Sequence, residues 1–396
     1  MISTILYIFV GVILGTISGI IPGIHVNTLI VLLLSFSSIT QLSATQIAIV
    51  IMSAAITHSI LDFIPAILLG APSEDSVAVM LPGHRMLLRG KGIEAIEYTI
   101  LGGLLATVFI WPILLYVYHI VEVYKKTFYN GALVALLSIS AWCIVQEKTT
   151  KQKVIATAVA VLAGVLGILA QNKISGNCLF PILTGLFAIP TLLESIPRKG
   201  KIPVQYAAHF EIPRIRSLSA GILGALAGTF VGILPGIGPA QAAIITNHNA
   251  KTEEYLLTVG GINTASAITG IYALYHLNVA RSGAVLAIQQ ILPNITMSTL
   301  ILLCGTVLTS AGLAAIGGIL ISKQLCTSIN KIEYTHISKV ILCSIFMLVY
   351  LLSGTKGIIL LITSAAIGII PVKTKVRRVH LMNVLILPLL WQQALI

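Results

Sequence analysis

Three stretches of this chain are predominantly apolar over more than 20 residues, and they constrain its fold more than any other feature. They cover residues 46–70, 95–120 and 296–322. In lipid every backbone N–H and C=O has to be satisfied within its own segment, so runs of roughly 18 apolar residues indicate membrane helices. A transmembrane β-barrel would alternate polar and apolar residues over about 10 positions, and these stretches do not alternate. They therefore predict an all-α polytopic membrane protein.

The composition agrees with a chain that lies mostly in lipid. Hydrophobic residues make up 57% and charged residues 9% of the chain, whereas soluble domains are roughly a quarter charged. The net charge of +12 comes from basic residues in short loops between apolar stretches, as the positive-inside rule expects. No basic face remains for nucleic acid, so we expect no nucleic-acid partner. The five cysteines form no CxxC pair or zinc spacing, and we expect neither a metal nor a cofactor.

Apolar runs and polar interruptions divide the chain into about 10 to 14 transmembrane or re-entrant helices. Two segments, 26–39 and 237–247, are too short to cross about 30 Å of hydrocarbon at roughly 1.5 Å per residue, and we expect half helices there. The candidate segments are 4–21, 26–39, 46–70, 95–120, 130–146, 154–171, 176–196, 217–235, 237–247, 255–277, 296–322, 337–353, 356–371 and 381–395.

Basic residues gather in four clusters, and placing all four in the cytoplasm lets the candidate segments alternate across the membrane. We expect a first membrane repeat over residues 1–197, a basic cytoplasmic linker over 198–216 and a second membrane repeat over 217–396. The clusters are Arg85, Arg89 and Lys91; Lys148, Lys151 and Lys153; Arg198, Lys199, Lys201, Arg214 and Arg216; and Lys373, Lys375, Arg377 and Arg378.

The chain matches itself in one place. GVILGTISGIIPGI at residues 11–24 aligns without gaps to GALAGTFVGILPGI at residues 224–237, with identity at eight of fourteen positions. Chance matches in an apolar chain would fall on Leu or Ile, whereas this match keeps a frame of glycines followed by Pro-Gly. In the orientation above, the first copy begins outside and the second inside. We therefore expect two inverted-topology repeats, the symmetry of many alternating-access carriers.

A Pro-Gly pair closes each copy, at Pro22 and Gly23 and again at Pro235 and Gly236. Glycines four residues apart let another helix approach closely, as small-xxx-small faces do in lipid. Proline removes a helix hydrogen bond and glycine accepts positive φ, so we expect both helices to break at these pairs. Broken segments at corresponding positions of two halves point to a transporter's substrate site, and the alternative is a pair of ordinary kinks.

Polar residues follow each break and recur in the next long helix of each half, where burial in a membrane makes them expensive and usually functional. Arg281 is the only lone cation in the polar set of the second half, which suits an anionic substrate, but it could equally be a snorkelling anchor. The predicted substrate-binding residues are Pro22, Gly23, His25, Asn27, Thr28, Pro235, Gly236, Gln241, Asn263, Thr264 and Arg281.

Four further residues are candidates for coupling transport to a sodium or proton gradient. His58 and Asp62 are four residues apart, so they share a helix face and could form a proton relay or coordinate a cation. The alternative is an internal pair that only fixes helix packing. Glu74 and Asp75 follow Ser73, which could cap a helix, so these acids could serve only the helix dipole.

Several blocks resemble the TctA family, the large membrane subunit of the tripartite tricarboxylate transporters, in the compact form found in archaea. They are GTISGIIPGI, GTFVGILPGIGPA, LLGAPSEDSVAVMLPGHRMLLRGKG, FPILTGLFAIPTLL and PVKTKVRRVHLMNVLILP, which together sample nearly the whole chain. The resemblance implies a secondary carrier of carboxylates such as citrate, driven by an ion gradient. It also implies a small membrane subunit and an extracytoplasmic binding protein, as in bacterial systems. This chain is shorter than bacterial members and has GAPSEDS where they have a glycine-proline-serine-threonine stretch.

These features favour a multi-pass cell-membrane permease that carries small organic anions, di- or tricarboxylates, by ion-coupled alternating access. A flippase or carrier of a lipid-linked phosphate is the main alternative, although it should need more cations in the membrane than Arg281. An intramembrane enzyme is a weaker alternative, because the chain has no HExxH, no GxGD-type aspartate pair and no Glu-Glu with a downstream Arg-His. We expect membrane lipids as neighbours, and a homodimer is left open.

Overall fold

A computed structural model of the chain is all-helical in the part that it describes, with no strand there. It describes residues 2–21, 29, 30, 33, 42–69, 75–123, 137, 138, 140–173, 178, 181, 182, 184–195, 203–206, 212–233, 238–246, 250–278, 280, 282–329 and 334–394. Seven helices within these ranges are long and apolar enough to cross a membrane: Ala44–Leu68, Gly92–His119, Thr150–Ala170, Arg214–Ile233, Thr252–Leu277, Met297–Ser328 and Ser353–Thr374. The chain is a polytopic α-helical membrane protein, as the apolar stretches predict.

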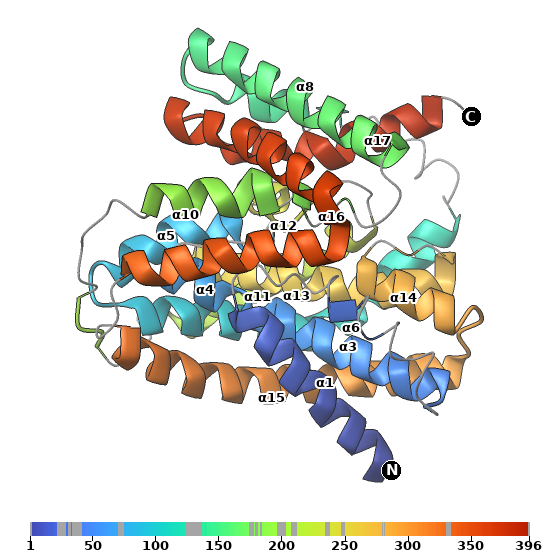
Figure 1. Cartoon of the computed structure of the whole chain (residues 1–396). Coiled ribbons are helices and arrows are strands. Elements are labelled where there is room, and N and C mark those ends of the chain that lie inside the picture. The colour runs from blue at the N-terminus through green and yellow to red at the C-terminus, as the bar shows by residue number, and fades with distance from the viewer. Residues whose placement is uncertain are drawn as a thin grey trace.

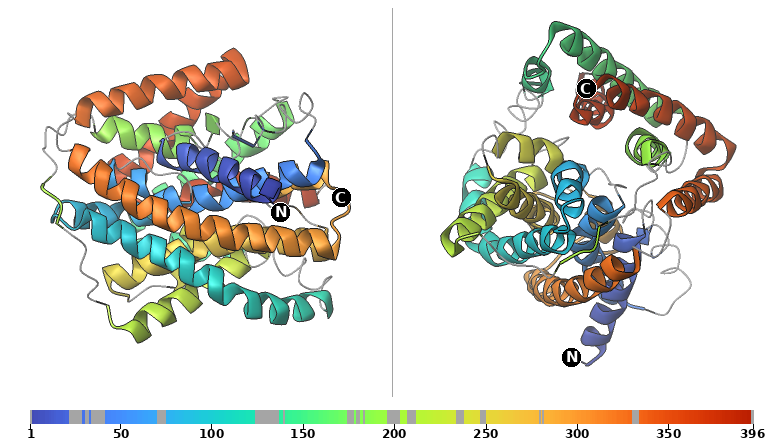
Figure 2. Two further views of the ribbon diagram at one scale, coloured as in Figure 1. Left: turned by 90° about the horizontal axis from the view of Figure 1, so that it is seen from below. Right: turned by 90° about the vertical axis from the view of Figure 1, so that its left-hand side faces the viewer.

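The helices form two bundles, which the right-hand view of Figure 2 separates most clearly. The core bundle consists of α1 (Ile2–Ile20), α3 (Ala44–Leu61), α4 (Phe63–Leu68), α5 (Val77–Leu87), α6 (Gly92–Val123), α11 (Arg214–Ile233), α12 (Pro239–Thr246), α13 (Thr252–Leu277), α14 (Gly283–Ile291) and α15 (Met297–Ile329). The outer bundle consists of α8 (Thr150–Lys173), the π-helix η1 (Thr184–Ala188), α10 (Ile189–Ser195), α16 (Tyr334–Thr374), the 3₁₀ helix η2 (Arg378–Met382) and α17 (Asn383–Ala394). Each half of the chain contributes to both bundles (Figure 1).

Within the core bundle, α13 packs against α6 and α11 with its backbone in direct contact. A Cβ added at Gly102 of α6 would collide with the Leu257 carbonyl oxygen, and one at Gly260 of α13 would collide with the Thr99 carbonyl oxygen. Glycine therefore sets the distance between these two helices, because any side chain would force them apart.

The first long apolar stretch is interrupted inside the core bundle. α3 ends at Leu61 and α4 begins at Phe63, with Asp62 between them. Pro65 has no N–H with which to bond the Leu61 carbonyl oxygen, so the helix cannot continue unbroken through this turn. Asp62 is 5% exposed, and the interruption therefore places a buried carboxyl group within a membrane-length segment.

Two matching contacts between glycine and proline hold the outer bundle together. A Cβ added at Gly167 of α8 would lie 2.9 Å from the Pro388 ring, and one at Gly368 of α16 would lie 2.8 Å from the Pro190 ring. In both contacts the glycine also faces the carbonyl oxygen four residues before the proline. One contact joins a glycine of the first half to a proline of the second, and the other does the reverse. The outer bundle therefore needs both halves of the chain.

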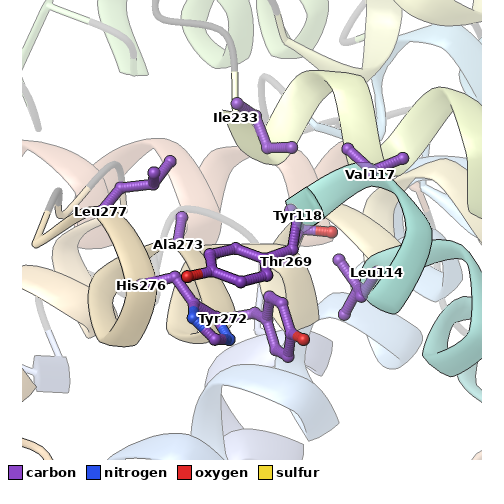
Figure 3. Close-up of a pocket in the computed structure, with 9 residues that line it drawn as sticks. All are labelled: Leu114, Val117, Tyr118, Ile233, Thr269, Tyr272, Ala273, His276 and Leu277. Carbon is purple, nitrogen blue, oxygen red and sulfur yellow. The ribbon is translucent and has the colours of Figure 1, made fainter. Parts of the chain in front are cut away.

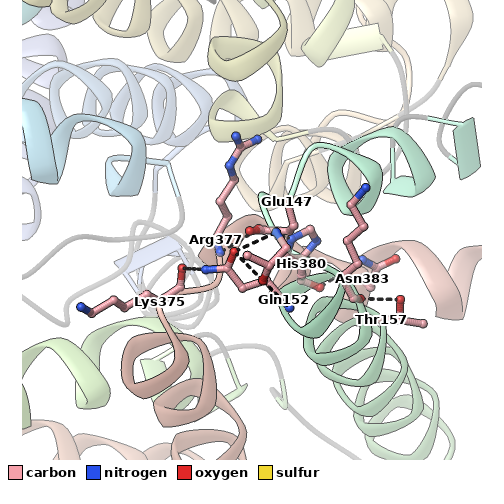
Figure 4. A network of polar contacts seen from close by, with 9 residues as sticks. Glu147, Gln152, Thr157, Lys375, Arg377, His380 and Asn383 are labelled. Carbon is pink, nitrogen blue, oxygen red and sulfur yellow. Dashed lines mark hydrogen bonds and ion pairs between the residues drawn. The ribbon is translucent and has the colours of Figure 1, made fainter.

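Polar contacts tie the start of α8 to the turn before α17 (Figure 4). The buried Glu147 carboxylate accepts a hydrogen bond from the backbone N–H of Arg377. The same carboxylate lies 3.0 Å from Nε2 of His380. Gln152 donates to the Lys375 carbonyl oxygen at 3.4 Å. Burial lowers the pKa of His380 more than the Glu147 carboxylate raises it, so the neutral ring donates its Nε2–H. The second and fourth basic clusters are thereby held next to each other.

The linker between the halves packs against the turn before α6. The Gly92 N–H donates to Oε1 of Gln205 at 2.7 Å. Arg216 at the start of α11 pairs with Glu254 at the start of α13, with 3.2 Å between Nη1 and Oε1. α6, α11 and α13 therefore all begin on the side of the linker.

Most of the candidate segments that fall on described residues are helices in the structure. The segments 337–353 and 356–371 are two arms of α16 that meet at Gly354, whose φ of 61° breaks the helix. Most of the segment 26–39, and residues 130–136 and 139 of the segment 130–146, lie outside the described residues. The structure adds α5 and α14, which are too short and, in α5, too polar to give an apolar run. The boundaries of the two repeats stay predictions.

The glycine contact between α6 and α13 is testable by a single methyl group. Gly102→Ala should destabilise the protein by about 1–3 kcal/mol, because the added methyl presses on the Leu257 carbonyl. Gly312→Ala in α15 is the matched control: nothing lies within 4 Å of its Cβ position, so it should be neutral or slightly stabilising. Unfolding of both purified variants in detergent measures the difference, and equal stability of the two would contradict the contact.

Candidate functional site

The glycines of the first repeated block pack α1 directly on the backbone of α3. A Cβ added at Gly15 would lie 2.5 Å from the Ala54 carbonyl oxygen and 2.7 Å from Cβ of Thr57. Gly11 and Gly19 meet α3 in the same way, one turn before and one turn after Gly15. The small-residue face that the sequence predicts is therefore a helix contact.

The second block packs α11 on α13 with the same pattern. A Cβ added at Gly228 would lie 2.6 Å from the Ile262 carbonyl oxygen and 2.5 Å from Cβ of Ala265. Gly224 and Gly232 meet α13 one turn before and one turn after. Each glycine thus faces a carbonyl oxygen and the Cβ, or in the case of Gly224 the Cα, three residues further along the partner helix.

The two helix pairs are packed in the same register. Gly15 corresponds to Gly228 with an offset of 213 residues, and its contact Ala54 corresponds to Ile262 with an offset of 208. Gly11 and Gly19 correspond to Gly224 and Gly232 with the same offset of 213, and their contacts in α3 and α13 again differ by 208. The correspondence between the halves therefore extends to α3 and α13, whose side chains do not match in sequence.

In each pair the two helices run in the same direction, since residue numbers rise together along the contact. The end of α1 therefore lies at the opposite end of its pair from the start of α3, and likewise for α11 and α13. In the second half α12 occupies part of the connection. It begins at Pro239, the first helical position, where proline costs no hydrogen bond.

A buried hydrogen bond joins His58 of α3 to α1. Oγ of Ser18 lies 3.0 Å from Nδ1 of His58, and the two residues are 2% and 5% exposed. Asp62 follows one turn later, and its backbone N–H donates to the His58 carbonyl oxygen at 2.9 Å. The imidazole and the carboxyl group are thus both buried, one turn apart, at the end of α3.

Asn263 of α13 reaches across to the same end of α3. Its Nδ2 donates to the Ser59 carbonyl oxygen at 2.9 Å, and its side chain is buried. The neighbouring Thr264 donates its hydroxyl to the Gly260 carbonyl oxygen and lies against Gly103 of α6. The structure thus brings Asn263, but not the hydroxyl of Thr264, to the backbone beside His58.

The remaining predicted site residues divide into two groups. Gln241 lies in α12, and Asp75 lies in the turn before α5 and is half-buried. The others lie outside the described residues, and their placement stays a prediction: Pro22, Gly23, His25, Asn27, Thr28, Glu74, Pro235, Gly236 and Arg281. Among the residues that the structure does describe, no three His, Cys, Asp or Glu side chains come together as a metal site.

Two residues of this site are not among the predicted site residues. Ser18 is one polar residue in an apolar helix, and Ser59 contributes only a backbone oxygen. The sequence does contain a signal for Ser18, because it directly precedes Gly19 of the repeated block and so lies on the face that meets α3. No side-chain pattern could have pointed to the carbonyl of Ser59.

A small pocket of about 20 Å³ lies between α6, α13 and the end of α11 (Figure 3). The ring of His276 stacks on Tyr118 with 3.5 Å between centroids and lies 4.4 Å from Tyr272. Ile233, the last described residue before the second Pro-Gly pair, forms part of the wall. The pocket has room for about one water molecule, so it is too small for a carboxylate substrate. It does place aromatic rings beside the end of α11.

The comparisons with known proteins agree with the glycine and proline blocks. A family model described as "Tripartite tricarboxylate transporter TctA family" matches residues 5–383. The chain belongs to the TctA family. An uncharacterized protein of Methanocaldococcus jannaschii is 30% identical over 393 residues, which cover 97% of each chain. No solved structure matches the chain. TctA proteins are transporter subunits rather than enzymes, so this multi-pass membrane protein is a component of a tricarboxylate transporter.

The bridge between the halves can be tested through Asn263. Asn263→Ala should destabilise the protein by about 1–3 kcal/mol, because it leaves the buried Ser59 carbonyl without this donor. Gln290→Ala, on the exposed side of α14, should change stability by less than about 0.5 kcal/mol. Thermal unfolding of the two variants distinguishes them, and an Asn263→Ala protein as stable as the control would show that the bond does not hold the halves together.

Proposed function

We propose that this TctA-family chain is a secondary active permease that carries a small di- or tricarboxylate by ion-coupled alternating access. The observation that carries the proposal is the pair of glycine-packed helices, α1 on α3 and α11 on α13, that share one register. Each of α1 and α11 ends just before a Pro-Gly pair. Paired helix ends in two halves of a membrane chain are where carriers place their substrate and coupling ion.

The helix directions support an inverted relation between the two halves. α6, α11 and α13 begin on the linker side. α3 runs towards that side, because its last residue Leu61 and Ile100 near the start of α6 both lie against Gly318 of α15. α1 and α3 then run opposite to α11 and α13, as Figure 1 lets the reader follow. Opposed broken helices allow a central site to open to either side in turn.

The substrate carboxylate would bind at the segments that begin after Gly23 and Gly236. A half-helix N-terminus carries roughly +0.5 charge and unused N–H groups, so it can hold a carboxylate without a full positive charge. In α12 the first intrahelical donor is Ala242, which bonds the Gly238 carbonyl oxygen. The N–H groups of Ala240 and Gln241 precede it and are directed towards the break.

The coupling cation would bind at the opposite, negative end of a helix dipole, at the C-terminal end of α3. A helix C-terminus carries partial negative charge and suits a cation. There the buried Asp62 carboxyl group, the His58 ring and the Leu61 carbonyl, which Pro65 cannot bond, lie within one turn. The proposal extends to the partners of the family's tripartite systems, a small membrane subunit and an extracytoplasmic binding protein.

The substrate site can be tested by binding. Gly236→Val should abolish binding of citrate or succinate, because we expect the break to need positive φ at this position, where a β-branched residue costs on the order of 1–3 kcal/mol. Gly312→Val in α15 is the control, since its Cβ position is open. Thermal-shift titration of both proteins with each acid, and with a polyprenyl phosphate, decides the substrate class. Unchanged binding in Gly236→Val would move the site elsewhere, and binding of the polyprenyl phosphate alone would favour a lipid carrier.

The ion site can be tested by separating coupling from exchange. Asp62→Asn should abolish citrate uptake driven by a proton or sodium gradient, because the neutral amide no longer balances a cation in a buried site. The variant should still fold and exchange citrate for citrate across proteoliposome membranes. Glu253→Gln, at a half-buried position in the first turn of α13, is the control and should keep both activities. Gradient-driven uptake that persists in Asp62→Asn would contradict the assignment.

A further inference from the structure

Two buried hydroxyl groups of α3 lack the hydrogen bond that buried hydroxyls in helices usually make. Buried threonines normally donate to a backbone carbonyl of the preceding turn, as Thr99, Thr107, Thr229, Thr264 and Thr269 do here. Ser53 and Thr57 are both 0% exposed, and neither hydroxyl has a hydrogen-bond partner among the described residues. Leaving a buried hydroxyl unbonded costs free energy, so a structural role alone would favour Ala and Val at these positions.

Both hydroxyls belong to the face of α3 that meets the glycines of α1. A Cβ added at Gly11 would lie 2.5 Å from Cβ of Ser53, and one at Gly15 would lie 2.7 Å from Cβ of Thr57. The Ser18 to His58 hydrogen bond is the next contact along the same helix pair. Polar groups therefore follow one another along this contact from Ser53 to His58. The buried Asp62 lies one turn beyond His58, about nine residues or roughly 13 Å of helix from Ser53.

The second half provides an internal control for what packing requires. With the offset of 208 residues, Ser53 corresponds to Gly261, Thr57 to Ala265 and His58 to Ser266. Gly261 and Ala265 make the same close contacts with the glycines of α11 and carry no polar group. Close packing of these helix pairs therefore needs only small side chains. The hydroxyls of Ser53 and Thr57 occur in the first half alone and are not needed for the packing.

A third hydroxyl of this kind lies on a neighbouring helix. Ser310 of α15 is 0% exposed and has no hydrogen-bond partner within the described ranges. α15 packs along α3. Buried hydroxyls without partners are thus concentrated on α3 and a helix beside it.

We infer that the hydroxyls of Ser53 and Thr57 line the path of a monovalent coupling cation, H⁺ or Na⁺, along α3 to His58 and Asp62. The inference rests on the proposed ion-coupled transport and names the residues that conduct the ion. A hydroxyl oxygen can coordinate Na⁺, or it can accept a proton on its lone pair and release its own to the next group. In either case the positive charge ends at the carboxylate of Asp62, and the path runs through the first half alone.

The test uses a change that removes only the hydroxyl. Thr57→Val, with Ser53→Ala as a second variant, should reduce gradient-driven citrate accumulation by roughly 5- to 150-fold, the usual range of coupling between two sites. Citrate counterflow without a gradient should continue. The melting temperature should stay the same or rise, because an unbonded hydroxyl is removed. Imposed pH and sodium gradients, applied separately to the parent, identify which cation drives uptake.

Thr269→Val is the matched control. Thr269 meets Gly232 in α11 as Thr57 meets Gly15, but its hydroxyl already bonds the Ala265 carbonyl oxygen. This variant should keep accumulation and counterflow.

Two outcomes would overturn the inference while leaving the proposed function in place. One is normal accumulation in both Thr57→Val and Ser53→Ala. The other is a loss of accumulation that is matched by a lower melting temperature and lost counterflow, since that marks a packing role. A parent protein that exchanges neither citrate nor succinate would instead overturn the proposed function and the inference with it.

Discussion

Direct contact between helix backbones, which glycine allows, is the constraint on which the rest of this structure depends. Lipid chains are as apolar as leucine, so burial of apolar side chains alone gives helices little reason to associate within a membrane. Close approach replaces that driving force with dense van der Waals packing and brings polar groups within bonding distance. The bonds from Ser18 to His58 and from Asn263 to the Ser59 carbonyl both lie beside such contacts. Without the glycines those buried polar groups would have no partners in lipid.

The two halves use the same packing for different chemistry. The contact of α1 with α3 carries an imidazole and two hydroxyls, with a buried carboxyl group one turn further along α3. The contact of α11 with α13 carries small residues at the corresponding positions. A carrier that couples two solutes needs two distinct sites whose affinities depend on each other. In the mechanism that we propose, paired helices with unequal side chains would meet that need, since both halves would move alike while only the first binds the ion.

The sequence predicted those parts of the structure that depend on local composition. Long apolar stretches became crossing helices, and the glycine frame of residues 11–24 and 224–237 became two helix contacts. It did not predict α5 and α14, because short helices inside a protein need no long apolar run. It paired α3 with α13 only as the next long helix of each half and did not predict their shared register, since the offset changes from 213 to 208 residues and the side chains differ. Pairing of Gly167 with Pro388 joins positions more than 200 residues apart, and no local pattern encodes such a partner. Of the predicted site, His58, Asp62 and Asn263 meet at the end of α3, while the residues of the two breaks lie outside the described ranges.

The interleaving of the two halves in the outer bundle decides the order in which this protein can assemble as it is synthesised. α8 enters the membrane long before its partner α17 is translated. Its most apolar 18-residue window has a mean hydropathy of 2.3, so α8 can remain in the membrane as a single helix. η1 and α10 are too short to span the membrane alone, and α16, which packs against both of them, is also translated late. Contacts between distant parts of a chain form slowly, and incomplete intermediates expose surfaces that invite misassembly. α16 and α17, within the last 60 or so residues, thus complete the assembly of the outer bundle. If translation stops before them, α8, η1 and α10 are left without their partner helices.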